Sequence, residues 1–104
     1  MARLELLFGT ERAEGPPVGE AEWAAFLDEE VTPRFPDGLT VLTGYGQWRG
    51  SAGTVAKEQS RVLLVWYRPT GESEANIEAI RSAYKLRFGQ ESVLRADGTS
   101  CVSF

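Results

Sequence analysis

The sequence contains no histidine, and this absence restricts its chemistry more than any other feature. Histidine is the usual general base at neutral pH, a common zinc ligand and the activator of serine and cysteine nucleophiles. The only cysteine, Cys101, excludes an internal disulfide and any metal site built from several cysteines. Glycine-rich phosphate loops and dinucleotide fingerprints are also missing. We therefore expect no metal or nucleotide cofactor, and we interpret Cys101 as a small packed residue.

Long apolar runs and clustered basic charge are missing as well. No apolar run approaches the roughly 20 residues that cross a bilayer, and the start MARLELLFG lacks the features of a secretory signal. A net charge of −4, with acidic and basic residues mixed along the chain, argues against a nucleic-acid surface. We therefore expect a cytoplasmic protein that binds neither membrane nor nucleic acid, unless a leader has been removed.

The first half of the chain alternates between strand and helix patterns. Its length of 104 residues, with 42% hydrophobic and 25% charged residues, is typical of one soluble domain over residues 1–104. Period-2 alternation predicts a strand over Arg3–Gly9. An apolar stripe predicts a helix that begins at Glu20 and ends before Pro33. The residues of the stripe are Trp23, Phe26, Leu27 and Val31.

The middle of the chain predicts a β-hairpin. A turn at Pro36–Gly38 leads into a strand that starts at Leu39 and continues through GYGQWRG (44–50). A connection at Gly50–Gly53 precedes a second strand over Ser60–Tyr67.

The last third predicts one helix and one strand. Ser73 is a plausible N-cap, and Gly89 follows the last helical turn. We expect a strand over Ser92–Ala96, a turn at Asp97–Gly98 and a short extension over Cys101–Phe104. The order strand, helix, strand, strand, helix, strand favours an α+β, ferredoxin-like βαββαβ sandwich, in which both helices cover one face of a four-stranded antiparallel sheet.

One strand of that sheet is apolar on both faces. The segment RVLLVWY (61–67) has no polar side chain between Arg61 and Tyr67. A sheet with one bare apolar face usually covers it with a second subunit or a ligand. We therefore predict a homodimer formed through the sheet face. The alternative is that the carboxy-terminal tail and the loop before the first helix fold over this face.

The stretch GYGQWRG is the main candidate for a site. In a strand, Gly44, Gly46 and Trp48 point to one side. The two glycines would leave a depression walled by Trp48, with Tyr45, Gln47 and Arg49 as hydrogen-bonding groups at or near its rim. The structural alternative is a bulge or bend in a long hairpin strand.

The partner strand supplies the other candidate residues. Glu58 and Arg61 flank Ser60 and could form a surface ion pair or a buried cluster with the first strand of the hairpin. If Glu58 lies under Trp48 and Trp66, burial would make it a usable general acid or base. Glu5 is a second carboxylate that could face the same side, with an interfacial salt bridge as the alternative.

The segments VTPRFPDGLTVL, GYGQWRG and RFGQESVL and the ending CVSF resemble a small bacterial family, domain of unknown function 3574. The resemblance runs from Glu5 to Phe104 and implies a single compact domain. It implies no catalytic residues. Relatives often begin with a signal or lipoprotein leader, which is not seen here.

Two hypotheses of function follow from these candidates. The first is a cofactor-independent small-molecule enzyme, such as an isomerase or cyclase, with its pocket on the open sheet face of a dimer. Tyr45 and Glu58 would transfer protons, and Arg49 would bind an anionic or carbonyl group. Further ligand contacts would come from Gln47, Trp48, Arg61 and Trp66. The alternative is a non-catalytic module that binds a small molecule or a protein through the same face.

Overall fold

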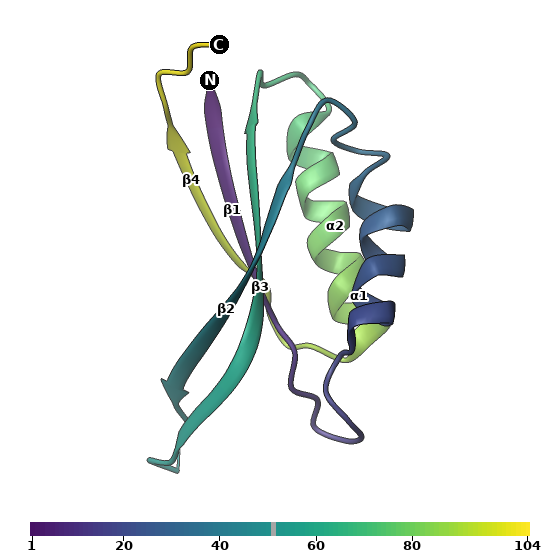
Figure 1. Ribbon diagram of the computed structural model, residues 1–104, viewed down its shortest axis with the longest axis vertical. Helices are drawn as coiled ribbons and strands as arrows, with labels where there is room; N and C mark the ends of the chain where they lie inside the picture. The colour runs from purple at the N-terminus through teal and green to yellow at the C-terminus, as the bar shows by residue number, and fades with distance from the viewer. Residues whose placement is uncertain (51) are drawn as a thin grey trace.

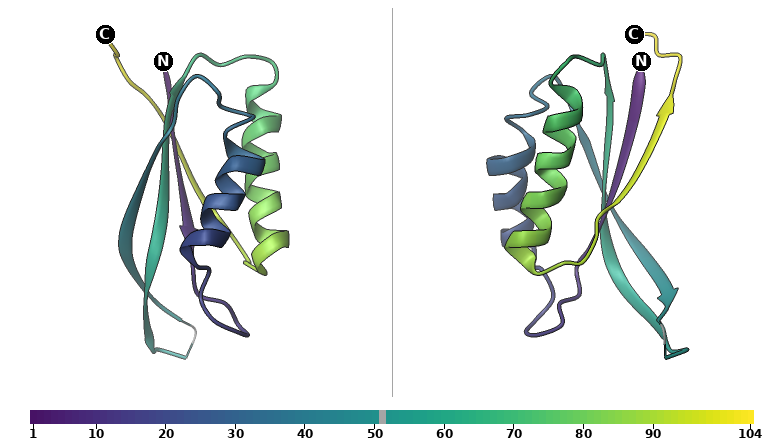
Figure 2. Two further views of the ribbon diagram at one scale, coloured as in Figure 1. Left: turned by 45° about the vertical axis from the view of Figure 1, so that its right-hand side comes forward. Right: turned by 180° about the vertical axis from the view of Figure 1, so that it is seen from behind.

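The computed structural model describes residues 1–50 and 52–104, and it has the predicted architecture. Four strands form one antiparallel sheet in the order β2-β3-β1-β4, and the helices cover one of its faces (Figures 1 and 2). The ferredoxin-like prediction is therefore confirmed. The elements are β1 (Ala2–Gly9), α1 (Glu20–Phe26), its π-helical continuation η1 (Leu27–Val31), β2 (Thr40–Arg49), β3 (Val55–Tyr67), α2 (Ser73–Phe88) and β4 (Leu94–Thr99).

The core lies between the sheet and the helices and is built around aromatic rings. The alternation of β1 directs Phe8 towards the helices, where its ring centroid lies 4.7 Å from that of Tyr84 and 5.1 Å from that of Trp23. The Tyr84 hydroxyl donates a 2.6 Å hydrogen bond to the Gly9 carbonyl oxygen. Burial raises the pKa of Tyr84 to about 12, so this side chain stays neutral and structural. Trp23, Phe26 and Val31 are buried as predicted.

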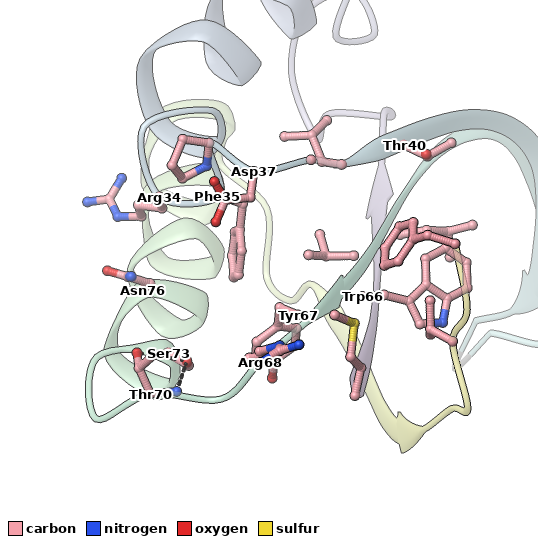
Figure 3. Close-up of a pocket in the computed structure, with 18 residues that line it drawn as sticks. Arg34, Phe35, Asp37, Thr40, Trp66, Tyr67, Arg68, Thr70, Ser73 and Asn76 are labelled. Atoms are coloured by element: carbon pink, nitrogen blue, oxygen red, sulfur yellow. Dashed lines mark hydrogen bonds between the residues drawn. The ribbon is translucent and has the colours of Figure 1, made fainter.

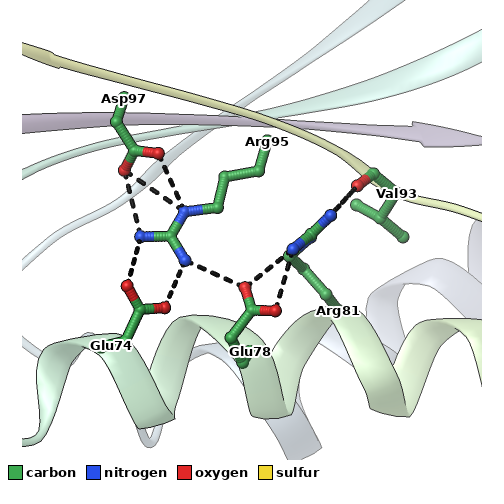
Figure 4. Close-up of polar contacts among 6 residues, drawn as sticks. All are labelled: Glu74, Glu78, Arg81, Val93, Arg95 and Asp97. Carbon is green, nitrogen blue, oxygen red and sulfur yellow. Dashed lines mark hydrogen bonds and ion pairs between the residues drawn. The ribbon is translucent and has the colours of Figure 1, made fainter.

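An ion-pair network joins β4 to α2 on the helix-covered face (Figure 4). Arg95 contacts Glu74 at 2.5 Å, Glu78 at 2.9 Å and Asp97 at 3.0 Å. These hydrogen bonds, above all the one to Glu74, raise the pKa of Arg95. The network fixes the edge strand β4 to the helix layer.

Two predictions at the carboxy-terminal end are wrong. Asp97–Gly98 does not turn but continues β4, because Gly98 pairs with Arg3 and its missing side chain leaves room for the Arg3 guanidinium. Cys101 is exposed rather than packed, since the segment 100–104 leaves the sheet without forming a strand. The same segment contains Phe104, which is fully exposed.

Other boundaries differ by small amounts. β3 begins at Val55, five residues before the predicted start at Ser60, because the long β2 strand gives it a partner from Val55 to Leu64. Glu72 rather than Ser73 occupies the N-cap position, and the Ser73 hydroxyl instead accepts a 2.7 Å hydrogen bond from the Thr70 N–H. Gly89 ends α2 in a left-handed conformation, as predicted. The predicted connection at Gly50–Gly53 includes position 51, which lies outside the described residues.

The hairpin of β2 and β3 extends past the ends of the helices (Figure 1). Its register runs from Thr40 opposite Leu64 to Arg49 opposite Val55 without an inserted residue. The structural alternative for GYGQWRG was a bulge or bend, and this register contains no bulge. In the described part of the chain, no helix is long and apolar enough to cross a membrane.

Candidate functional site

The face of the sheet that the helices leave uncovered is apolar on all four strands. The register directs Leu7 of β1, Val62 and Leu64 of β3 and Leu94 of β4 to this open face. Leu42, Trp48, Trp66 and Leu94 are each between 43% and 56% exposed. The Glu5 carboxylate lies on the same face, 3.5 Å from Arg3, so its pairing is within the protomer. The tail beyond β4 therefore leaves most of the face uncovered, contrary to the alternative considered from the sequence, and borders only the Trp66 end, where Val102 and Phe104 lie.

The glycines of GYGQWRG lie on this open face and have different surroundings. Neither Gly44 nor Gly46 has a positive φ, so the backbone conformation does not require glycine at either position. A methyl group at Gly44 would lie 3.2 Å from the Ser60 hydroxyl oxygen, whereas one at Gly46 would meet nothing within 4 Å. Gly44 therefore makes room for Ser60, and Gly46 borders open space.

This space is part of a cleft of about 620 Å³ at the hairpin end of the open face. We call it the hairpin cleft, and its principal lining residues are Gly9, Gly46, Trp48, Glu58, Gln90 and Leu94. It also takes in the loops that follow β1 and α2. Strands β1, β2, β3 and β4 thus supply its floor, and two loops supply its polar rim.

Glu58 is the oriented carboxylate of the hairpin cleft. Its Oε2 atom accepts a 2.7 Å hydrogen bond from the Glu11 N–H. A methyl group added at Gly9 would lie 2.6 Å from Glu58 Oε1, so this oxygen occupies the space that a side chain at Gly9 would take. The absence of a side chain at Gly9 therefore allows the carboxylate to reach into the cleft.

Gln90 approaches the same point from the other side. Its Nε2 atom donates a 2.6 Å hydrogen bond to the Glu11 carbonyl oxygen. Its Oε1 atom lies 3.4 Å from the position of a methyl group at Gly9. Two acceptor oxygens, one from Glu58 and one from Gln90, therefore flank one niche beside Gly9.

Three of the predicted site residues lie on the opposite face of the hairpin. Tyr45, Gln47 and Arg49 alternate with Gly44, Gly46 and Trp48, and they point to the side of the sheet that carries the helices. Tyr45 is 86% exposed because the hairpin extends past those helices. Of the three, only Gln47 also borders the hairpin cleft.

Arg61 is buried and turned away from Glu58. It lies under α1 with 4% exposure, donates to the Thr43 hydroxyl at 2.9 Å and forms a 2.6 Å ion pair with Glu20. Its Nε atom is buried without a hydrogen-bond partner among the described residues. Arg61 thus links the sheet to the start of α1 and does not reach the hairpin cleft.

Trp66 borders a different cleft at the far end of the sheet. Trp48 lies opposite Ala56, ten residues along β3 from Trp66, which corresponds to about 33 Å of strand. The two tryptophans therefore cannot wall one small-molecule pocket within a protomer.

The cleft beside Trp66 has a volume of about 660 Å³. We call it the aromatic cleft, and its lining includes Phe35, Asp37, Trp66, Tyr67, Ser73 and Phe104. In Figure 3, Trp66 and Thr40 lie on one side of β3, and Tyr67 and Ser73 lie on the other. Burial raises the pKa of Tyr67, which keeps its hydroxyl protonated.

Gly9 and Gln90 were not predicted as site residues. Both follow the end of an element, Gly9 at the end of β1 and Gln90 directly after the glycine that ends α2. No local pattern indicates that these two positions meet. The segment RFGQESVL, which carries part of the family resemblance, was the available signal for Gln90.

Metal binding finds no support in the geometry. Within residues 1–50 and 52–104, no group of three His, Cys, Asp or Glu side chains lies close enough together to hold a metal ion.

The comparisons with known proteins agree with this fold. A family model described as "Protein of unknown function (DUF3574)" matches residues 3–104. No curated protein matches the chain by sequence. Two solved structures superpose on it with TM-scores of 0.70 and 0.69, at 13% and 12% identity. They are a phage SAM lyase in complex with S-methyl-5′-thioadenosine and a phage SAM lyase in the apo state. Each alignment covers 93% of this chain, and 79% and 78% of the respective structures.

Proposed function

Because the chain belongs to the DUF3574 family of proteins of unknown function, its activity has to be inferred from the site, and we propose a small-molecule enzyme that uses acid–base chemistry in the hairpin cleft. The observation that carries this proposal is the geometry of Glu58. One carboxylate oxygen is held by a backbone N–H, and the other lies beside the niche at Gly9. A carboxylate held in this way would be within hydrogen-bond reach of a ligand in the niche, as a general base has to be.

The neighbouring side chains suit the same role. Trp48 is half exposed and forms an apolar wall, as small-molecule sites typically require. Ser60 lies opposite both Gly9 and Gly44, so its hydroxyl is within the floor of the cleft. Glu58 would take up or return a proton, and Trp48 and Gln47 would contact the ligand. Tyr45, Arg49 and Arg61 have no role in this proposal because they face away from Glu58.

The likeness to the two SAM lyase structures supports the choice of first ligands. The similarity concerns the fold, and at 12–13% identity it carries no residue roles to this chain. It does provide an example of this fold with a bound small molecule, S-methyl-5′-thioadenosine. SAM and S-methyl-5′-thioadenosine are therefore reasonable first probes.

We also propose that a second copy of the chain covers the open face. Leu42 and Leu94 are 50% and 56% exposed at its edges, and Val62 and Leu64 lie between them. Burial of such a surface stabilises a dimer by about 25 cal/mol per Å² of apolar area. A second subunit would also exclude water from the hairpin cleft, which strengthens electrostatic interactions there.

The same exposed leucines favour the second candidate function, a non-catalytic binding module. In that case the open face binds a small molecule or a protein, and Glu58 contributes no turnover. The two functions differ in whether a bound molecule is chemically changed.

The test begins with native mass spectrometry of the protein purified gently from its host. We expect a dimer that carries a small molecule, which is identified and then incubated with the protein, alongside SAM, while products are followed by mass spectrometry. The Glu58→Gln variant should lower the turnover at saturating substrate by at least about 100-fold. Asp28→Asn, which removes one exposed carboxylate of η1, is the control and should have no effect. Equal turnover by both variants would overturn the role of Glu58 as general base, and binding without any product would overturn the enzyme and favour the module.

A further inference from the structure

We infer that the ligand of the hairpin cleft presents an organic cation, an ammonium or sulfonium group, to Glu58 and Gln90, with its apolar part against Trp48. This inference rests on the proposed function, because it concerns the same cleft. It adds the chemical class of the molecule that the cleft recognises. The observation that supports it is that two oriented acceptor oxygens, from Glu58 and Gln90, lie beside Gly9.

Hydrogen bonds determine which atoms face this niche. The Glu11 N–H holds Glu58 Oε2, so the remaining carboxylate oxygen is the one beside Gly9. The Glu11 carbonyl oxygen accepts from Gln90 Nε2, so the amide of Gln90 turns its oxygen towards the same point. The backbone of one residue, Glu11, therefore orients both side chains. The niche offers two acceptors, and an acceptor pair selects a cation or a hydrogen-bond donor.

The charge around the cleft points to a cation in preference to a neutral donor. Its lining includes the carboxylates of Glu11, Glu58 and Glu91, and no lysine or arginine of the described chain lines it. Glu11 and Glu91 are exposed, so they add a screened attraction and no direct contact. A cleft lined by charge of one sign raises the local concentration of oppositely charged ligands. Anionic ligands are disfavoured for the same reason.

The wall of the cleft suits an organic cation rather than a metal ion. Trp48 is 50% exposed and lines the cleft together with Gly46, which presents no side chain to the open space. Tryptophan is the best partner for cation–π contact with ammonium-type groups. The three carboxylates do not come close enough together to form a metal-binding group within the described residues. A proton beside a cationic centre is also more acidic, so recognition and proton transfer by Glu58 are compatible.

The test compares cations with neutral molecules of matched shape. Choline and its neutral isostere 3,3-dimethylbutan-1-ol form one pair. SAM and S-adenosylhomocysteine form another, in which both molecules carry the α-ammonium and only SAM carries the sulfonium charge. Binding is followed through the NMR amide signals of Gly9, Gly46 and Gln90. We expect each cation to shift these signals and to bind at least about tenfold more tightly than its neutral partner. Glu58→Gln should remove most of this preference, whereas Asp28→Asn should keep it.

Two results would overturn the inference. One is equal affinity for the neutral partners, and the other is failure of both cations to shift the three amide signals at millimolar concentrations. The proposed enzyme is judged separately, by turnover of the co-purified molecule. Glu58-dependent turnover of a neutral substrate would refute the inferred cationic ligand and support the proposed enzyme. Preferential cation binding, together with unchanged turnover in Glu58→Gln, would support the cationic ligand and refute Glu58 as the general base.

Discussion

The two clefts have similar volumes, about 620 and 660 Å³, and lie at opposite ends of the same sheet, yet they differ in chemistry. The hairpin cleft has one aromatic wall, Trp48, and a rim of carboxylates. The aromatic cleft has Phe35 and Tyr67 in edge contact, 5.6 Å between ring centroids, and the exposed ring of Trp66. The same strands pass through both, and the difference comes from the strand residues at each end, Trp48 and Glu58 against Trp66 and Tyr67, together with the loops that enter there.

The polar groups of the two clefts also have different partners. In the aromatic cleft, the Ser73 hydroxyl accepts from the Thr70 N–H, and Arg34 forms a 2.9 Å ion pair with Glu30. These groups hold the backbone and the helix end in place. In the hairpin cleft, Glu58 and Gln90 each use one atom for support and keep one oxygen beside Gly9. The hairpin cleft is thus distinguished by two acceptor oxygens that converge on one point beside Gly9, and not by its volume.

The largest expected effect is the loss of turnover when a side chain at position 9 fills the niche between Glu58 and Gln90. In Gly9→Ala, the new methyl group would lie 2.6 Å from Glu58 Oε1, and the flexible carboxylate would have to move. A displacement of about 1 Å in a catalytic group costs on the order of 100-fold in rate, and we expect turnover to fall by about that factor. Steady-state kinetics with the co-purified substrate would measure it.

Gly71→Ala, in the loop between β3 and α2 and outside both clefts, is the control for the niche. Its methyl group would meet nothing within 4 Å, so turnover should change by about twofold or less. Similar losses in both variants would mean that the loss in Gly9→Ala does not come from the position of Glu58.

The second-largest expected effect is on ligand affinity, and it distinguishes the two clefts through the tryptophan residue that lines each of them. Trp48→Ala should weaken binding of a cationic ligand about 2- to 30-fold, because it removes a cation–π contact of about 0.5–2 kcal/mol. Trp66→Ala should leave this affinity within about twofold, since Trp66 lies about 33 Å of strand away. Isothermal titration calorimetry of both variants would measure the difference. A larger loss in Trp66→Ala would locate the ligand in the aromatic cleft.

The smallest effect concerns carboxylates outside both clefts. The hydrogen bond from Arg81, followed by that from Arg95, lowers the pKa of Glu78 below its usual value of 4.5. A lowered folded-state pKa contributes stability that is present above about pH 4.5 and is lost as the pH falls through the folded-state pKa. Glu78 is 47% exposed, so solvent screening limits this contribution to less than about 1 kcal/mol.

Urea unfolding at several pH values would measure this contribution. Glu78→Gln should be slightly less stable at pH 7 and should lose less stability than the parent below pH 4.5. Glu14→Gln, an exposed loop substitution, is the control. A parallel pH profile in parent and Glu78→Gln would contradict the assignment of Glu78 to the acid response.

Much of the fold could be predicted because its signals are local. Alternation over β1 and the apolar spacing of α1 directly reflect which side chains face the core. The turn predicted at Asp97–Gly98 was wrong because a long-range contact, the Arg3 guanidinium over Gly98, overrides the local turn preference. Cys101 was misjudged because nothing local indicates that the last residues leave the sheet.

The candidate site was predictable only in part. Alternation correctly separated Trp48 from Tyr45, Gln47 and Arg49, but it could not say how far each strand extends past the helices. Arg61 and Glu58 are three residues apart, so strand geometry already sends them to opposite faces. Trp66 was grouped with Trp48 because they share a face, whereas the length of β3 separates them.

By itself, the sequence determined the order of the elements, the helix-facing side of each strand and the apolar open face, because these depend on the periodicity of side chains along one element. Only the tertiary structure decided that Gly9, Glu58 and Gln90 meet, because they come from three segments far apart in the chain. The physical reason is that a strand pattern specifies the direction of each side chain, whereas the distance between side chains of different strands depends on register and loop path.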